Sequence, residues 1–312
     1  MPLRPLAAVL AAVLVAGTAT ACGATAAGTP PDGRLAVVTA FYPLRFLATR
    51  LGGDRITVTD LTKPGAEPHD VELNPRQVGQ ISDAALVVYL KGFQPAVDEA
   101  VEQEAADRGF DAGATVDLLP VAAEEHEHVP GEEEHAEAAG GNDPHVWLDP
   151  VRFAAITRAL GERLAATDPA HAAGYRARAA AVQRDLETLH AEFAAGLRSC
   201  ARHEFVTSHE AFHYLAERYG LTEVGITGIS PEAEPSPRRL AEVAAEARAT
   251  GTTTIFFETL VSPEVAETIA REVGARTAVL DPLEGLTEPG ADYFSVMRRN
   301  LAALQQALGC TS

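Results

Sequence analysis

Apolar and polar residues follow two alternating patterns along most of the chain. Leu35 to Phe41 is an apolar run that ends in Tyr42-Pro43, and Ile56 to Leu61 alternates as a strand does. Segments with helical spacing follow such runs, which predicts parallel sheets with helices on both faces. Strands are expected at 35–41, 56–61, 85–90, 115–118, 204–207, 223–226, 253–257 and 277–280.

The middle of the chain has helical spacing without strands. It runs from Pro150 to Ala166, is interrupted by Asp168-Pro169, and continues as an Ala-rich segment from Ala170 to about Leu197. A helix of that length spans roughly 40 Å and would join two halves as a strut. We therefore predict an α/β fold with two lobes, 34–168 and 199–312, each a mainly parallel sheet flanked by helices. One long rigid helix, 169–198, joins them.

Residues 119–142 depart from this pattern. Between Glu124 and His135 the chain holds six Glu and three His, and nothing there can form a core. We interpret the segment as a loop in which His126, His128 and His135 could hold cations transiently. The alternative is a solvated insertion without a function.

The N-terminus is typical of an exported protein. Arg4 and the short apolar run that follows predict a signal peptide over 1–21. Ala19-Thr20-Ala21 then leads into Cys22, which resembles the site where bacterial lipoproteins are cleaved and lipidated. We expect Cys22 to anchor the chain to the outer face of the membrane through a tether over 22–33. An ordinary cleaved signal with an incidental cysteine is the alternative.

Charge and cysteine content narrow the range of functions. The formal net charge of −19 argues against a nucleic-acid partner and in favour of cations. With Cys22 assigned to the anchor, Cys200 and Cys310 remain, and an extracytoplasmic location permits a disulfide between them. Two unpaired thiols are the alternative.

Four residues whose side chains can bind a metal ion lie just after predicted strands or on adjoining loops: His69, His145, His209 and Asp281. In open α/β sheets, ligands collect at the carboxyl ends of the strands, so these side chains can converge on one crevice. Three imidazoles and a carboxylate are a plausible tetrahedral zinc set. Each histidine alone could instead be a hydrogen-bonded structural residue.

The stretch from His209 to His213 also reads HExxH, the motif that places two histidines on one helix face in zinc metallopeptidases. However, 204–208 is expected to be a strand, which leaves His209 before the helix. The prolines and glycines after it also argue against a helix that presents a third ligand. We therefore expect no enzyme, and we assign Glu210 a role in orienting the site from outside the ligand shell.

Several motifs together resemble the metal-binding solute-binding lipoproteins of ABC importers for zinc and manganese. The resemblance runs from about residue 35 to 308. It rests on Glu67-Pro68-His69-Asp70, Asp143-Pro144-His145-Val146-Trp147-Leu148-Asp149-Pro150, Ser208-His209-Glu210-Ala211-Phe212, and Phe257-Glu258 with Leu280-Asp281-Pro282-Leu283.

The resemblance implies that His69, His145, His209 and Asp281 bind the ion, with water or another carboxylate as the alternative to Asp281. It also implies a fold of two lobes bridged by a long helix. Manganese members have glutamate where this chain has His209, so zinc is expected and a manganese-specific member is the alternative. Zinc members also carry an acidic, His-rich loop before the Asp-Pro-His motif. The implied function is capture of Zn²⁺ and delivery to an ABC permease, by a monomer. A zinc-stabilised surface adhesin is an alternative of another class.

Overall fold

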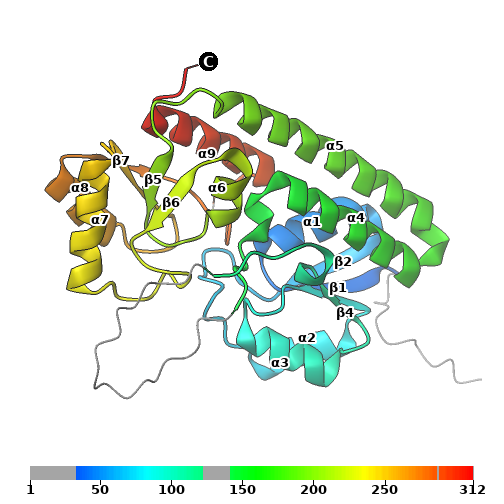
Figure 1. Ribbon diagram of the computed structural model, residues 1–312. Coiled ribbons are helices and arrows are strands. Elements are labelled where there is room, and N and C mark those ends of the chain that lie inside the picture. Colours follow the sequence, from blue (N-terminus) through cyan, green and yellow to red (C-terminus); the bar gives the residue numbers. More distant parts are fainter. Residues whose placement is uncertain (1–32, 122–140, 287, 312) are drawn as a thin grey trace, which may run out of the picture.

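The computed structural model describes residues 33–121, 141–286 and 288–311, and its first lobe contains a parallel four-stranded sheet. The strands lie in the order β2-β1-β3-β4, with helices on both faces (Figure 1). The elements are β1 (Leu35–Thr39), α1 (Tyr42–Gly52), β2 (Ile56–Asp60), α2 (Pro75–Asp83), β3 (Leu86–Tyr89), α3 (Pro95–Glu104) and β4 (Gly109–Asp111).

The second lobe repeats this plan with the order β6-β5-β7-β8, again all parallel. In both sheets the chain returns to the opposite side of the first strand, and the crevice at such a switch point is where α/β folds bind ligands. The elements are β5 (Glu204–Thr207), α6 (His213–Tyr219), β6 (Thr222–Gly225), α7 (Pro237–Ala249), β7 (Thr254–Phe257), α8 (Glu264–Val273), β8 (Arg276–Val279) and α9 (Tyr293–Leu308).

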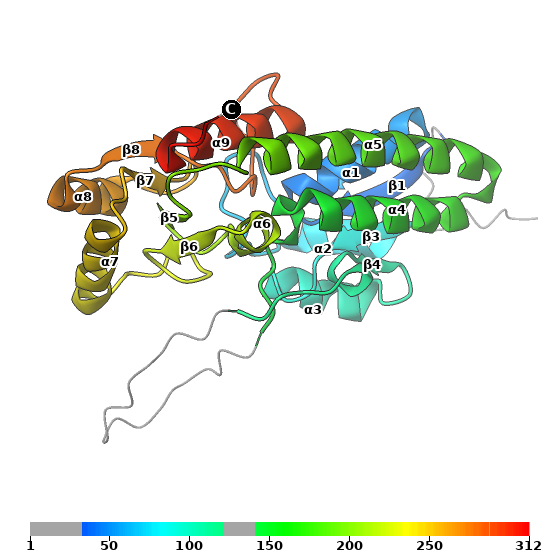
Figure 2. The same cartoon turned by 45° about the horizontal axis from the view of Figure 1, so that its top comes forward.

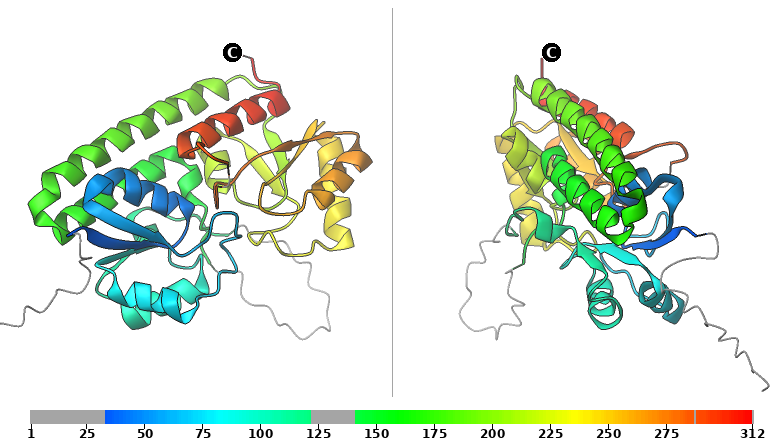
Figure 3. Two further views of the ribbon diagram at one scale, coloured as in Figure 1. Left: turned by 180° about the vertical axis from the view of Figure 1, so that it is seen from behind. Right: turned by 90° about the vertical axis from the view of Figure 1, so that its right-hand side faces the viewer.

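Two helices, α4 (Pro150–Thr167) and α5 (Ala172–Gly196), connect the lobes and pack side by side (Figure 2). The 25 residues of α5 extend about 37 Å. The left view in Figure 3 shows α5 crossing from the first lobe to α9 of the second. Its buried stripe repeats every three or four residues: Tyr175, Ala179, Val182, Leu186, Leu189 and Phe193. The predicted two-lobe fold with a long connecting helix is confirmed, whereas the residue limits of the lobes remain a prediction.

One predicted strand is wrong. Residues 115–118 do not pair with a neighbour, and β4 instead lies at Gly109–Asp111, parallel to β3. The apolar side chains of Val116 and Leu118 pack against the core from outside the sheet.

The main hydrophobic core crosses from one lobe to the other. It includes Phe41 and Trp147 from the first lobe and its connection to α4, and Phe205 and Tyr293 from the second. A smaller cluster fills the far side of the second lobe around Val243 and Ile255. The lobes therefore share packed side chains.

The predicted disulfide is present and joins Cys200, just after α5, to Cys310, just after α9. It ties the end of the connecting helix to the end of the chain. None of the helices in the described ranges combines the length and the apolar character that a membrane crossing requires. The predicted signal peptide, Cys22 and the histidines at 126, 128 and 135 lie outside the described residues.

Candidate metal centre

Three histidines and one glutamate meet between the lobes: His69, His145, His209 and Glu284. One potential ligand atom from each lies within 4.8 Å of all the others. Oε1 of Glu284 is 3.0 Å from Nε2 of His145, 3.2 Å from Nε2 of His69 and 3.3 Å from Nε2 of His209. The structure thus brings the three predicted histidines together around a buried carboxylate.

These spacings suit a tetrahedral ion. Ligand atoms about 2.0–2.1 Å from zinc lie about 3.3–3.4 Å from one another along the edges of the tetrahedron. The Nε2 atoms of His145 and His209 are 3.4 Å apart, and the nitrogen-to-carboxylate distances are similar. Oε2 of Glu284 has no hydrogen-bond partner among the described residues, so this carboxylate retains an acceptor atom for an ion. Little rearrangement would be needed to close these groups around an ion.

Two carboxylates orient two of the imidazoles. Asp143 Oδ1 accepts the backbone N–H of His145 at 2.9 Å and contacts its Nδ1 at 2.8 Å. Glu258 Oε1 contacts Nδ1 of His209 at 2.7 Å. A carboxylate on Nδ1 fixes the tautomer that leaves Nε2 with a lone pair for a metal, and it raises the basicity of that nitrogen.

His69 is positioned by its loop, which follows β2. Gln94, buried on the adjoining segment, donates from Nε2 to the carbonyl of Pro68 at 2.9 Å. Glu67 accepts the backbone N–H of His69 at 2.9 Å, and the ring of Phe93 meets the imidazole edge to face at 4.6 Å. The backbone of His69 is therefore fixed by a hydrogen bond, and its imidazole packs against Phe93 on one side.

The negative charge of Glu284 acts on the pKa values of the three histidines. Burial lowers the pKa of the His145 imidazole, but the carboxylates of Asp143 and Glu284 outweigh it and raise the pKa to about 9. The pKa of His209 is also raised well above its usual value, because Glu284 and Glu258 outweigh burial. Burial lowers the pKa of His69. Although burial alone would raise the pKa of Glu284, the histidines hold it well below its usual value. Protons on the His145 and His209 imidazoles would therefore compete with an incoming cation.

Residues 37–307 match the family model described as "Zinc-uptake complex component A periplasmic". The chain belongs to this family. The resemblance inferred from the motifs is thereby confirmed.

Individual relatives agree. The zinc-binding lipoprotein AdcA of Streptococcus pneumoniae is 38% identical over 284 residues, which cover 88% of this chain and 56% of AdcA. The chain thus spans about half the length of that relative. The high-affinity zinc uptake system protein ZnuA of Bacillus subtilis is 34% identical, with 92% of this chain and 93% of ZnuA covered. The Zn(II)-bound ZnuA-like domain of S. pneumoniae AdcA superposes with a TM-score of 0.74 at 35% identity, covering 88% of this chain and 99% of that domain.

In this member of the zinc-uptake family, the group of converging ligand atoms contains Glu284 and does not contain the predicted Asp281. Asp281 Oδ1 accepts the backbone N–H of Leu283 at 2.8 Å, and Oδ2 lies 3.5 Å from the hydroxyl of Thr259. The carboxylate therefore shapes the turn that follows β8. Glu284, three residues later, occupies the fourth position.

The HExxH stretch does not adopt the geometry of a metallopeptidase. Helix α6 begins at His213, so His209 precedes it, and the two histidines do not share a helix face. His209 joins the metal-ligand group, whereas Nδ1 of His213 lies 3.5 Å from Oδ2 of Asp143. The Glu210 carboxylate lies 3.8 Å from the guanidinium of Arg239. Glu258 Oε1 is the carboxylate oxygen at 2.7 Å from Nδ1 of His209.

The sequence analysis gave neither Glu258 nor Glu284 a role in the site. Glu258 directly follows β7, where residues gather at the crevice, and Phe257-Glu258 is also one of the motifs behind the family resemblance. Glu284 lies between Leu283 and Gly285, and all three are buried. An acidic residue inside an apolar turn after a strand is a pattern that could have indicated it.

Proposed function

We propose that this protein captures Zn²⁺ outside the cytoplasm and delivers it to the permease of an ABC importer. The observation that carries this proposal is the convergence of three Nε2 atoms and one buried carboxylate within 4.8 Å. His69 and His145 come from the first lobe and its connection to α4, and His209 and Glu284 from the second. An ion bound by all four would link the lobes.

The donor set favours zinc. Three imidazole nitrogens suit zinc better than Mn²⁺, Mg²⁺ or Ca²⁺, which prefer oxygen ligands. Four protein ligands would complete the tetrahedron and leave no open position for a substrate or a reactive water. A complete protein shell supports binding rather than catalysis.

Delivery and location follow from the family and from the printed names of the relatives. AdcA is named a zinc-binding lipoprotein and ZnuA a zinc uptake system protein. By analogy, the chain would act as a monomer anchored outside the membrane by lipidated Cys22. The core shared between the lobes supports small shifts of loops and lobes during transfer, rather than a wide hinge motion.

The histidines at 126, 128 and 135 would bind cations transiently and pass them to the site. Deletion of residues 122–140 should then leave tight binding intact while it slows capture at low zinc concentration. Loss of the tight site together with the loop would contradict this role. Stopped-flow binding with a competing zinc indicator measures both quantities.

Competitive titration tests the specificity. The purified protein is titrated with Zn²⁺ and with Mn²⁺ against a chelating indicator, alongside His209→Glu and the control His171→Ala. His171 pairs with Asp168 at 2.8 Å, away from the site. We expect wild type and His171→Ala to prefer zinc strongly, and His209→Glu to lose much of that preference. A wild-type preference for manganese would overturn the proposal.

A further inference from the structure

The turn that carries Glu284 has an unusual backbone. Leu283 has φ of 61°, and it is the non-glycine residue with positive φ within the described ranges. Leucine rarely adopts this left-handed conformation, so the surrounding structure must impose it. Because Leu283 directly precedes Glu284, this backbone geometry sets the direction of the Glu284 side chain.

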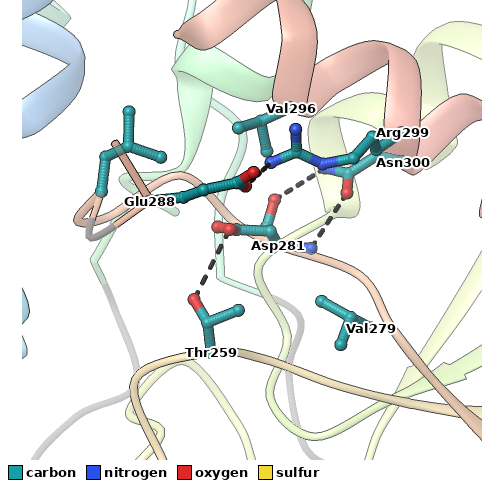
Figure 4. A pocket seen from close by; sticks show the side chains of 8 residues that line it. Thr259, Val279, Asp281, Glu288, Val296, Arg299 and Asn300 are labelled. Atoms are coloured by element: carbon teal, nitrogen blue, oxygen red, sulfur yellow. Dashed lines mark hydrogen bonds and ion pairs between the residues drawn. The ribbon is translucent and has the colours of Figure 1, made fainter. Parts of the chain in front are cut away.

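Asn300, on α9, holds the start of this turn. Its Oδ1 accepts the backbone N–H of Asp281 at 3.0 Å, and its Nδ2 donates to the carbonyl of Asp281 at 2.7 Å. Figure 4 shows the Asn300 side chain facing the backbone of Asp281. Only 2% of Asn300 is exposed, so water cannot readily replace these hydrogen bonds.

Two further contacts continue the restraint along the turn. Oδ1 of Asp281 accepts the N–H of Leu283, the residue with positive φ. Trp147, two residues after His145, donates from Nε1 to the carbonyl of Pro282 at 2.7 Å. Asn300 and Trp147 thus hold consecutive peptide groups immediately before Leu283 and Glu284.

The turn is not held by packing on all sides. A cavity of about 350 Å³ is lined by Asp281, Leu286, Asn300 and neighbours (Figure 4). On its rim, Glu288 forms an exposed ion pair with Arg299 at 2.8 Å, and such pairs contribute little. The cavity leaves space into which the turn could relax. Buried hydrogen bonds, rather than close packing, must therefore hold this side of the turn.

We propose that Asn300 is a positioning residue for the zinc site, which keeps the Glu284 carboxylate directed at the three histidines through the backbone of Asp281. This rests on the proposed function, because it assumes that Glu284 binds the ion. It also assigns Asp281 the role of holding the turn rather than the metal.

A double-mutant cycle tests this assignment. Zinc affinity is measured for wild type, Asn300→Ala, Glu284→Gln and the double variant. Asn300→Ala should weaken zinc binding by about 10-fold to 100-fold, the range typical when a group that orients a ligand is removed. In the Glu284→Gln background, the same change should cost less than about threefold, because the group that it positions is already impaired. Equal losses in both backgrounds would overturn the proposal.

Cobalt supplies a readout that general destabilisation would not change. Wild type loaded with Co²⁺ should show the intense visible bands of a four-coordinate ion, and Asn300→Ala the weaker bands of a higher-coordinate one. The control is Leu304→Ala on the same helix, where a fully buried core side chain is shortened. It should lower Tm and leave affinity and spectrum unchanged. Bands in Asn300→Ala identical to wild type would contradict the proposal.

Two contingencies keep the test decisive. Should Asn300→Ala fail to fold, Asn300→Ser retains one hydroxyl for the Asp281 backbone and should give an intermediate loss of affinity; an unchanged affinity would refute the role. Absence of tight zinc binding in wild type would overturn the proposed function itself. If Glu284→Gln loses zinc affinity and Asn300→Ala does not, only the positioning role of Asn300 is overturned.

Discussion

Replacing Glu284 by glutamine removes one negative charge from the centre of the site without changing the size of the side chain. The carboxylate is fully buried, and its Oε1 lies 3.0–3.3 Å from three imidazole nitrogens. Removing one member of a buried charged contact typically costs about 2–5 kcal/mol. This corresponds to a loss of zinc affinity between about 30-fold and about 4,000-fold.

Proton competition makes this loss depend on pH. Glu284 helps to raise the pKa values of His145 and His209, so the glutamine variant lowers both. Fewer protons then compete with zinc at low pH, which offsets part of the lost attraction. We therefore expect the affinity ratio of wild type to Glu284→Gln to be largest near pH 8 and smaller near pH 6.

The assay is competition against a chelator of known affinity at pH 6, 7 and 8. The matched control is Asp281→Asn, which keeps an oxygen to accept the N–H of Leu283 and should bind zinc within a few-fold of wild type. If Asp281→Asn loses affinity as severely as expected for Glu284→Gln, while Glu284→Gln binds normally, the assignment of the fourth ligand is refuted.

Three further results are expected. Because the pKa of His145 is raised to about 9, zinc must displace its proton, and zinc affinity should fall below about pH 9 by about tenfold per pH unit for each displaced proton. Calorimetry at pH 7 in buffers of different ionisation enthalpy should detect this proton release, and a zinc affinity unchanged from pH 8 to pH 6 would contradict it. Changing both Cys200 and Cys310 to serine should lower the free energy of unfolding, measured in urea, by roughly 2–5 kcal/mol, because the disulfide joins positions 110 residues apart. An unchanged free energy of unfolding would mean that the disulfide constrains the chain little. Arg218→Ala should cost about 1–3 kcal/mol, because Arg218 contacts both carboxylate oxygens of the buried Asp149 at 2.7–3.1 Å; an unchanged urea midpoint would refute this.

The fold was largely predictable because strands and helices alternate in a regular hydrophobic pattern. The cap of α4 was also predictable, since Asp149 before Pro150 is a common helix start, and its side chain accepts the N–H of Val151. The position of the fourth strand, β4, was not predictable. Gly109–Asp111 is a short edge strand without a run of β-branched residues, whereas the more apolar residues at 116 and 118 pack against the core from outside the sheet.

The three histidines could be predicted because each follows a strand or lies in a loop fixed by proline. Spacing along the chain could not decide which carboxylate joins the histidines, since Asp281 and Glu284 lie in the same turn after β8. The choice depends on the left-handed backbone of Leu283 and on the contact from Asn300. Both are tertiary features that spacing along the chain does not reveal.

The central claim is that four named side chains hold one zinc ion between the two lobes. Crystals of the zinc-loaded protein, measured on both sides of the zinc absorption edge, test it directly. The account predicts one strong anomalous peak about 2.0–2.1 Å from Nε2 of His69, His145 and His209 and from a carboxylate oxygen of Glu284. A peak bound by Asp281 in place of Glu284, or one that lacks any of the three histidines, would contradict it.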